Sequence, residues 1–363
     1  MSSNVIALPR HTLSKPRPFA ALAQSFARHR RDQSDVYWLK ENAELLSILE
    51  CTGAKVQAQD LECYLPFYQS LPERITFFPQ YYRFLTSIAL DLEALGIEGG
   101  HAATLCAFVY EDNLIEAELS DLQRAETARL LMRRSFEVQG DQALRRRLHR
   151  FIDNCATFAL PNRKVAYELT HIVFYLSEYG RRDPELSAQA CSSLMFTGIL
   201  AHLEQNADLL AEVCVALRYA GRVPPARWEQ WIETVVNGFD RVADLDGAGD
   251  HYHEYLVTNW ACAQKDSEAF GARYCATGQG FFSPVVPLGA LSFLSEVLFN
   301  WQGPRIASWA AMEDRVYDAL PHDIAQHLSD VVEASADFDA LFSHFVRAPR
   351  ARKTTRAPLM RNV

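Results

Sequence analysis

The chain has 363 residues, of which 49% are hydrophobic and 22% are charged, and this composition excludes a wholly disordered chain or a collagen-like repeat. Its 36 Lys and Arg residues against 45 Asp and Glu residues give a net charge of −9, but the charge is unevenly distributed. Residues 1–34 carry six basic residues and one acid, and residues 346–363 carry six basic residues and no acid, so the middle of the chain is strongly acidic. An acidic middle repels nucleic acid at long range and argues against it as a partner, whereas the basic ends are suited to contact an anionic partner.

Residues 35–345 form a single predicted helical domain. Apolar residues recur there with the helical period of about 3.6, and short stretches with Gly, Pro or Asp separate the periodic segments. Helices are expected from residue 36 to near residue 52 and over 81–95, 99–112, 118–137, 141–156, 162–179, 184–204, 206–220, 225–240, 251–268, 288–300, 305–319, 322–333 and 336–347. No run of residues alternates as a β-strand does. Residues 1–34 are expected to be a flexible basic arm, and residues 346–363 a basic C-terminal tail.

The connections between the predicted helices are short, which favours antiparallel helical hairpins. Asp183 and Pro184 make a favourable helix start, with Asp as the N-cap and Pro at the first helical position. A dozen or more helices joined in this way predict an all-α fold, either an α/α ring resembling a toroid or a curved α-solenoid. The helical period does not choose between these two arrangements.

The eight cysteines and the longest uncharged segment bear on the location of the protein. No two cysteines form a Cys-x-x-Cys pair, and several lie in apolar stretches, which favours reduced thiols and a cytoplasmic location. The uncharged residues 274–295 contain three glycines and two prolines, which would interrupt a membrane helix. Neither a transmembrane segment nor a secretory signal is predicted.

The segment 162–179 contains the best candidates for catalysis. On a helix, Glu168, His171 and Tyr175 lie on the face opposite an apolar stripe that includes Leu169 and Val173. The imidazole of His171 suits general acid or base catalysis, and Glu168 is spaced to point at the same volume. We therefore take His171, Glu168 and Tyr175 as candidate catalytic residues, with a surface or interface network as the alternative.

Two further histidines follow an acidic loop at residues 244–250. His251 and His253 are two residues apart, so their side chains diverge by about 200° on a helix and do not chelate one ion together. The segment is predicted to be a capped helix start with one histidine facing a cavity. The candidate metal ligands are His171 and His253, which leaves a divalent metal open as a cofactor, although the sequence has no His-Glu-x-x-His zinc motif.

A basic run at residues 145–150, RRRLHR, precedes the apolar pair Phe151 and Ile152. Its charges are expected to form the solvated side of an amphipathic helix. A binding site for an anion is the alternative.

Three segments carry a resemblance to a known family. They are WLKENAELL at residues 38–46, FPQYYRFL at 78–85 and ELTHIVFYLSEYG at 168–180. In this layout the chain resembles an uncharacterised all-helical bacterial family of unknown function, over about residues 35–345. The resemblance implies a helical fold and a bacterial cytoplasm, and it brings no catalytic residues with it.

Two hypotheses for the function follow. The first is a helical scaffold or binding module, in which stacked hairpins present a concave surface to a protein partner. The second is an enzyme or small-molecule binder, in which Glu168, His171, Tyr175 and His253 meet in a central cavity, with or without a divalent metal. The second hypothesis requires side chains from different hairpins to meet.

Overall fold

The computed structural model describes residues 18–242, 249–267, 269–271, 280–283 and 288–348. The regular secondary structure of these residues is almost entirely helical, which confirms the predicted all-α fold. Polar side chains determine where several helices begin. Asp35 accepts a hydrogen bond from the backbone N–H of Tyr37, and Asn206 accepts one from the backbone N–H of Leu209. These caps fix the first turns of α2 (Val36–Cys51) and α11 (Ala207–Tyr219), which both contribute to the site described below.

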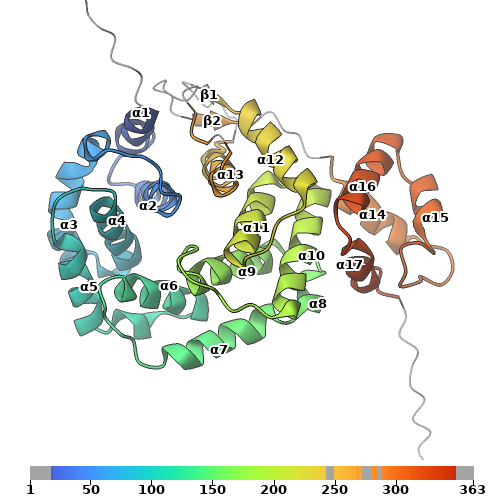
Figure 1. Ribbon diagram of the computed structural model, residues 1–363, viewed down its shortest axis with the longest axis horizontal. Coiled ribbons are helices and arrows are strands. Elements are labelled where there is room, and N and C mark those ends of the chain that lie inside the picture. The colour runs from blue at the N-terminus through green and yellow to red at the C-terminus, as the bar shows by residue number, and fades with distance from the viewer. Residues whose placement is uncertain (1–17, 243–248, 268, 272–279, 284–287, 349–363) are drawn as a thin grey trace, which may run out of the picture.

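Within the described part of the chain, six helices form an inner ring (Figure 1). Each helix packs against the next, and the last packs against the first. In order around the ring they are α2, α4 (Tyr82–Ala94), α6 (Asp121–Met132), α9 (Arg163–Leu176), α11 and α13 (Tyr252–Gln264).

A second layer of helices covers the outside of this ring. Each outer helix packs against the inner helix that follows it in the chain, and all but the first also pack against the inner helix that precedes them. The outer helices are α3 (Leu65–Phe77), α5 (His101–Glu111), α7 (Asp141–Ile152), α10 (Ala188–Glu204) and α12 (Ala226–Gly238). Because inner and outer helices alternate along the chain, the inner helices all run in the same direction. The short helices η2 (Ala58–Tyr64), η3 (Pro79–Tyr81), η4 (Leu114–Ala117) and α8 (Cys155–Phe158) lie in the connections.

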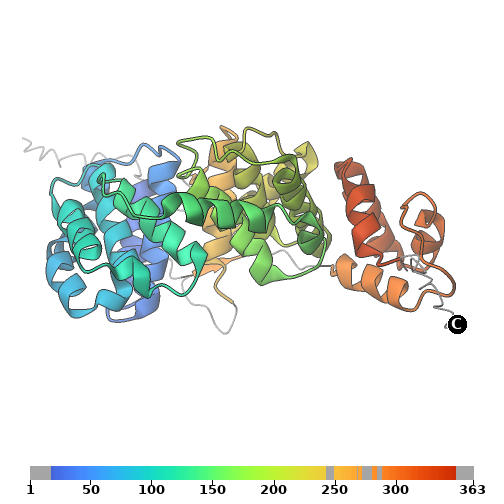
Figure 2. The same cartoon turned by 90° about the horizontal axis from the view of Figure 1, so that it is seen from below.

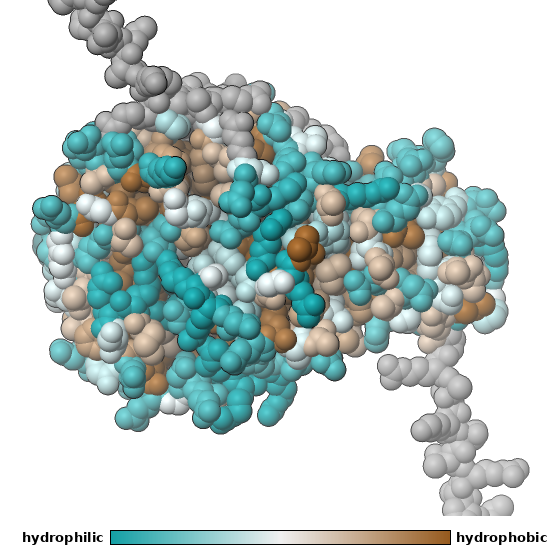
Figure 3. Space-filling model, in the orientation of Figure 1, coloured by the Kyte–Doolittle hydropathy of each residue, from teal (hydrophilic) through white to brown (hydrophobic). Residues whose placement is uncertain are grey.

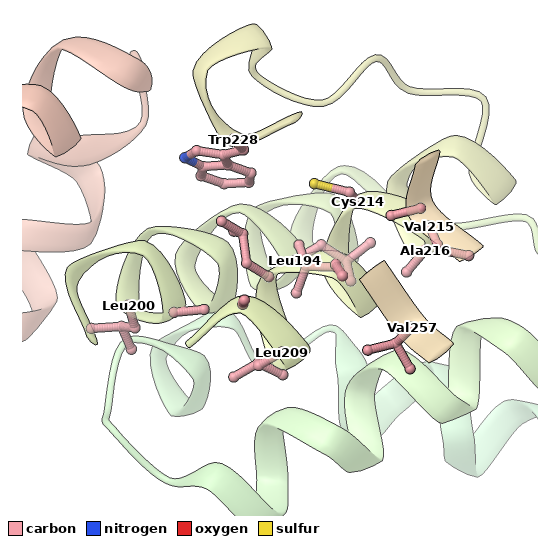
Figure 4. Packing of buried hydrophobic residues seen from close by; sticks show 14 of the residues in the cluster. Leu194, Leu200, Leu209, Cys214, Val215, Ala216, Trp228 and Val257 are labelled. Carbon is pink, nitrogen blue, oxygen red and sulfur yellow. The ribbon is translucent and has the colours of Figure 1, made fainter. Parts of the chain in front are cut away.

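The core between the two layers is apolar and tightly packed. In Figure 4, Trp228 of α12 lies over side chains of α10 and α11, among them Leu194 and Cys214. The fully buried Trp228 ring approaches the backbone of α10 at Gly198, where a Cβ atom would lie 2.4 Å from a ring carbon. Glycine at this position therefore allows the two helices to approach each other closely.

The connection between α9 and α10 covers one end of the ring interior, at the C-terminal ends of the inner helices. Arg181 in this connection pairs with Glu50 of α2, and the Tyr179 ring stacks on Trp260 of α13 with centroids 5.7 Å apart. On the face seen in Figure 3, which is mainly hydrophilic, side chains fill the middle of the ring. The side chains at the opposite, N-terminal ends of the inner helices therefore define the other end of the ring interior.

The N-terminal segment differs from the expected flexible arm over the residues that the structure describes. Residues 18–34 contain α1 (Pro18–Gln24) and the π-helical η1 (Ser25–His29), and Phe26 is completely buried. The side chain of Arg30 is 1% exposed and pairs with Glu41 of α2 at 2.9 Å and with Asp250. The basic residues of this segment thus include a buried ion-pair partner, which charge counting alone does not reveal. Residues 1–17 lie outside the described residues.

A short two-stranded antiparallel sheet is the one departure from the all-helical expectation in the described residues. The strands β1 (Asp240–Val242) and β2 (Gly280–Phe282) pair antiparallel, with Arg241 opposite Phe281. Each strand has three residues, too few to show an alternating pattern in the sequence.

Four C-terminal helices stand beside the ring (Figure 2). They are α14 (Ala290–Phe299), α15 (Glu313–Asp318), α16 (His322–Ala334) and α17 (Phe338–Phe345), and they contact the ring through α10 and α12. Of the helix expected at 305–319, only the part Glu313–Asp318 is α-helical. The basic C-terminal tail lies outside the described residues from residue 349 onward. None of the described helices combines the length and the apolar character needed to cross a bilayer.

Candidate metal centre

Two carboxylates project from the N-terminal half of α11. Asp208 and Glu212 are four residues apart and share a face of the helix. The hydroxyl of Tyr167 donates to Asp208 Oδ2 at 3.0 Å, and the hydroxyl of Thr170 donates to Glu212 Oε2 at 2.5 Å. Both donors belong to the neighbouring helix α9. The carboxylates are therefore held in fixed positions, and the Glu212 side chain is only 2% exposed.

His253 enters the same space from the first turn of α13. Its Nδ1 lies 3.4 Å from Glu44 Oε2 of α2, and its Nε2 faces the two carboxylates of α11. Glu44 also contacts Lys40, with 3.5 Å between Oε1 and Nζ. One imidazole thus lies between carboxylates of two inner helices that are far apart in the sequence. His251, which precedes the helix, contacts Glu254 instead, with 3.1 Å between Nδ1 and Oε2.

Burial and neighbouring charges shift the pKa values of this cluster. Burial raises the pKa of Asp208 to about 6; His253 opposes this rise, and the charge of Glu212 adds to it. Burial alone would raise the pKa of Glu212, but His171 and His253 outweigh burial and lower that pKa. Burial alone would lower the pKa of His253, but the three surrounding carboxylates raise it well above its usual value. Positive charge is therefore strongly favoured at this position.

The spacing of the side-chain atoms fits the ligands of a metal ion. His253 Nε2 lies 3.3 Å from Asp208 Oδ1 and 3.6 Å from Glu212 Oε1, and one atom from each residue lies within 4.8 Å of the others. Two ligands bound to one ion at about 2.1 Å in tetrahedral geometry are about 3.4 Å apart, whereas a good hydrogen bond is about 2.7–3.2 Å long. Among the described residues, Glu44 Oε2, Asp208 Oδ1 and His253 Nδ1 are buried atoms without a hydrogen-bond partner.

His171 lies on the other side of Glu212. Its Nδ1 is 2.7 Å from the backbone carbonyl of Tyr167, to which it is placed to donate, and 3.7 Å from Glu212 Oε2. His171 and His253 therefore contact opposite oxygens of one carboxylate. With the Nδ1 proton used in this way, Nε2 of a neutral His171 is an acceptor, and no partner occupies it among the described residues. The side chain is 34% exposed, so solvent and small molecules can reach it.

Within the described residues, the other two predicted catalytic residues make no polar contact with this cluster. Glu168 is half-buried and makes no hydrogen bond or ion pair with the rest of the described chain. Tyr175 is buried and packs its ring against His171, with centroids 6.1 Å apart and the planes nearly perpendicular. Burial, and next the charge of Glu126, raise the pKa of the Tyr175 hydroxyl well above its usual value. Tyr175 therefore supports the position of His171 from one helical turn away.

Sequence reasoning did not place Glu44, Asp208 or Glu212 in a functional site. A signal for Glu212 does exist, because its neighbours in α11 are almost all apolar and a carboxylate in such a helix is forced into the interior. The spacing of Asp208 and Glu212 then places both acids on one face. No local signal connects either residue with Glu44, because that contact depends on the closure of the ring.

The comparison with known proteins gives a family without an assigned activity. The chain matches the model of a domain of unknown function, DUF6902, over residues 2–348. The chain belongs to this family. The match confirms the sequence-based resemblance to an uncharacterised family. No curated protein and no solved structure matches this DUF6902 chain. The function therefore has to be argued from the geometry of the site.

Proposed function

We propose that the protein is a metal-dependent enzyme whose divalent ion is held by Asp208, Glu212 and His253. The observation that carries this proposal is the convergence of one atom from each of these residues within 4.8 Å. Glu44 lies against the other nitrogen of His253, where a carboxylate commonly orients a metal-binding imidazole. The hydroxyl groups of Tyr167 and Thr170 orient the two carboxylates in the same way.

The rival interpretation of the cluster is an ion-pair network with a protonated His253. This network would place three carboxylates around one imidazolium, with Lys40 against only one of them. A divalent ion on Nε2 of His253 offsets more of the buried negative charge than one proton does. The long contacts at 3.3 and 3.6 Å also favour ligands around an ion over hydrogen bonds.

A single imidazole with carboxylates suits a transition metal such as Zn²⁺ or Mn²⁺. Such an ion polarises a bound oxygen and lowers the pKa of a bound water. His171 is placed beside the Glu212 carboxylate with its Nε2 available, which suits a general acid or base for a small substrate in the ring. We therefore infer Lewis-acid chemistry, such as hydrolysis, as the reaction class.

Metal loading tests the ion-binding part of the proposal. The full chain is incubated with Zn²⁺ or Mn²⁺, desalted and analysed by inductively coupled plasma mass spectrometry, together with Asp208→Asn, Glu212→Gln and His253→Gln. We expect a stoichiometric ion in the wild type and its loss in all three variants. The matched control is Glu204→Gln, which removes a carboxylate that pairs with Arg163 near the surface. A wild type that holds neither ion, or variants that hold as much as the wild type, would contradict the proposal.

A second measurement separates catalysis from metal binding alone. The metal-loaded protein is assayed with small chromogenic esters and phosphomonoesters, and His171→Asn is compared with the wild type. We expect the variant to keep its metal and to lose about 100-fold or more in rate, the usual contribution of a general acid or base. Under the scaffold hypothesis, His171→Asn and the three metal-ligand variants would leave partner binding and the biological effect intact.

A further inference from the structure

Arg129 is a buried cation without a carboxylate partner in the part of the chain that the structure describes. It lies on the inner helix α6 and is 7% exposed, and its Nε has no hydrogen-bond partner. Its neighbours are paired: Arg83 lies 2.9 Å from Glu118, and Arg133 lies 2.6 Å from Asp91. Arg129 is thus an exception among the arginines around it.

Aromatic rings account for only part of the environment of Arg129. Its guanidinium lies 4.6 Å from the centroid of the Tyr179 ring and 5.8 Å from that of Tyr175. Cation–π contacts of this kind stabilise a guanidinium, but they use its faces and leave the buried Nε–H without an acceptor. A buried charge without acceptors is costly. The arrangement is therefore suited to a ligand that supplies the acceptors.

A cavity lies directly beside this guanidinium. It is formed by α6, α7 and α9 and opens to solvent. Arg145 of α7 lines the same cavity and has no ion-pair partner among the described residues. Arg182 also lines the cavity, but it pairs with Glu178 at 3.0 Å. Apart from this pair, the charged side chains of the lining are Arg129, Arg145 and Asp141. Their charges sum to a net positive charge. Apolar side chains such as Leu144 and Leu148 form much of the rest.

We propose that this cavity binds a small molecule that carries an oxyanion on an apolar body, with the oxyanion held by Arg129 and Arg145. The planar guanidinium presents its N–H groups to two oxygens of a carboxylate or phosphate. The apolar part of the ligand contacts the leucine side chains of α7. The site shares no residue with Asp208, Glu212 and His253, so it goes beyond the proposed metal chemistry and stands without it.

The proposed site agrees with the second of two interpretations of the basic run at residues 145–150. The sequence predicts the solvated side of a helix there, with an anion site as the alternative. Arg147 of this run pairs with Asp121 at 2.7 Å near the surface, whereas Arg145 faces the cavity. The run therefore serves two purposes, and only Arg145 contributes to the proposed site.

Calorimetric titration of the full chain tests the proposal. The probes are hexanoate and hexyl phosphate, which carry the two oxyanions, with hexanol as the uncharged analogue. We expect one of the two anions to bind the wild type and hexanol to bind much more weakly. The preferred probe identifies the ligand as a carboxylate or a phosphate. No binding of either anion to the wild type would overturn the proposal.

The variants locate the binding. Arg129→Met and Arg145→Gln are each expected to weaken the preferred anion about tenfold or more, the usual effect of losing a hydrogen bond to a charged group. The control Arg146→Gln changes an exposed arginine of the same helix and is expected to bind as the wild type does. Arg145→Gln lies at a half-buried position, so it tests the site even where Arg129→Met fails to fold. Equal binding by the wild type and Arg145→Gln would overturn the assignment.

Discussion

A carboxylate as completely buried as Glu212 depends on the donors around it. His171 and His253 lie against its two oxygens, but the orientation of these oxygens comes from Thr170, whose hydroxyl donates to Oε2. The carbonyl of Tyr167, 3.0 Å from the Thr170 hydroxyl, is the alternative acceptor for its single proton. Thr170 is thus a positioning residue for the proposed metal ligand and does not touch the ion.

We expect Thr170→Val to weaken the proposed metal site without removing a ligand. Valine keeps the shape of threonine and removes the hydroxyl, so Glu212 loses a fixed orientation and one donor. Loss of such a partner usually costs about 10- to 100-fold in metal affinity. Competition with a chromogenic chelator measures the affinity for Zn²⁺. The matched control is Thr170→Ser, which keeps the hydroxyl and should stay close to the wild type. A valine variant as tight as the wild type would show that Thr170 does not position Glu212.

The sequence predicted part of this site, and the missing part has a physical cause. His171 and His253 could be singled out because histidine is rare and each stands in a helix with a polar face. The acids that surround His253 come from α2 and α11, and acids are common on helix surfaces. Only the fold distinguishes Glu44 from a solvated glutamate, since its contact with His253 depends on a helix that lies far away in the sequence.

At the scale of helices, the close approach of α10 and α12 depends on a missing side chain. Gly198 faces the Trp228 ring, and the ring is completely buried. We expect Gly198→Ala to lower the free energy of unfolding by about 1–3 kcal/mol, because the added methyl group would overpack this contact. Urea denaturation measures the change.

A second substitution tests the cause of this loss. The double variant Gly198→Ala with Trp228→Phe removes the ring atoms that the methyl group would meet. We expect the two effects to be non-additive, with the alanine costing less in the phenylalanine background. Additive losses would show that the contact with Trp228 is not the source of the destabilisation.

The N-terminal segment stabilises the contact between α13 and α2. Arg30 pairs with Glu41 of α2 and with Asp250, which lies just before α13. Its guanidinium also lies 4.9 Å from the Phe26 ring and 5.0 Å from the Tyr252 ring. A short cationic segment is thus built into the junction of the first and last helices of the ring.

We expect Arg30→Met to lower the free energy of unfolding by about 1–3 kcal/mol, since Asp250 loses its guanidinium partner and Glu41 keeps only Arg31. Urea denaturation followed by circular dichroism measures this loss. Arg28→Gln changes an exposed arginine of the same segment and should have little effect. If both variants were equally stable, Arg30 would not contribute to the junction. The sequence identified this segment as basic, but the burial of one of its charges depends on the partners that the fold provides.

At the scale of the whole molecule, helical periodicity predicted the elements and left their arrangement open. The local pattern around Val36 or Leu169 indicates a helix and its apolar face, because both depend on nearby residues. The contact that joins α13 to α2 links the two ends of the ring, and no pattern within either helix encodes it. The periodicity likewise does not predict how the C-terminal helices pack against the ring.

The junction between the ring and the C-terminal helices should weaken in acid. His202 of α10 is 6% exposed and lies against His327 of α16, with ring centroids 5.6 Å apart. Burial, and next the charge of His327, lower the pKa of His202 to about 4. An unfolded histidine titrates near pH 6.5, so as the pH falls from 6.5 to 4 the unfolded chain binds a proton that the folded chain does not. The contribution of neutral His202 is therefore complete above pH 6.5 and is lost as the pH falls, by about 2 kcal/mol between pH 7 and pH 5.

Comparison of urea denaturation at pH 7 and pH 5 in the wild type and His202→Gln measures this dependence. The variant has no titrating group at residue 202, so we expect its stability to fall by about 2 kcal/mol less than that of the wild type over the same range. His322→Gln changes an exposed histidine of α16 and should follow the wild type. Because the contact joins α10 to α16, the acid-sensitive step should separate the C-terminal helices from the ring. Identical pH profiles for the wild type and His202→Gln would place the acid sensitivity of the molecule elsewhere.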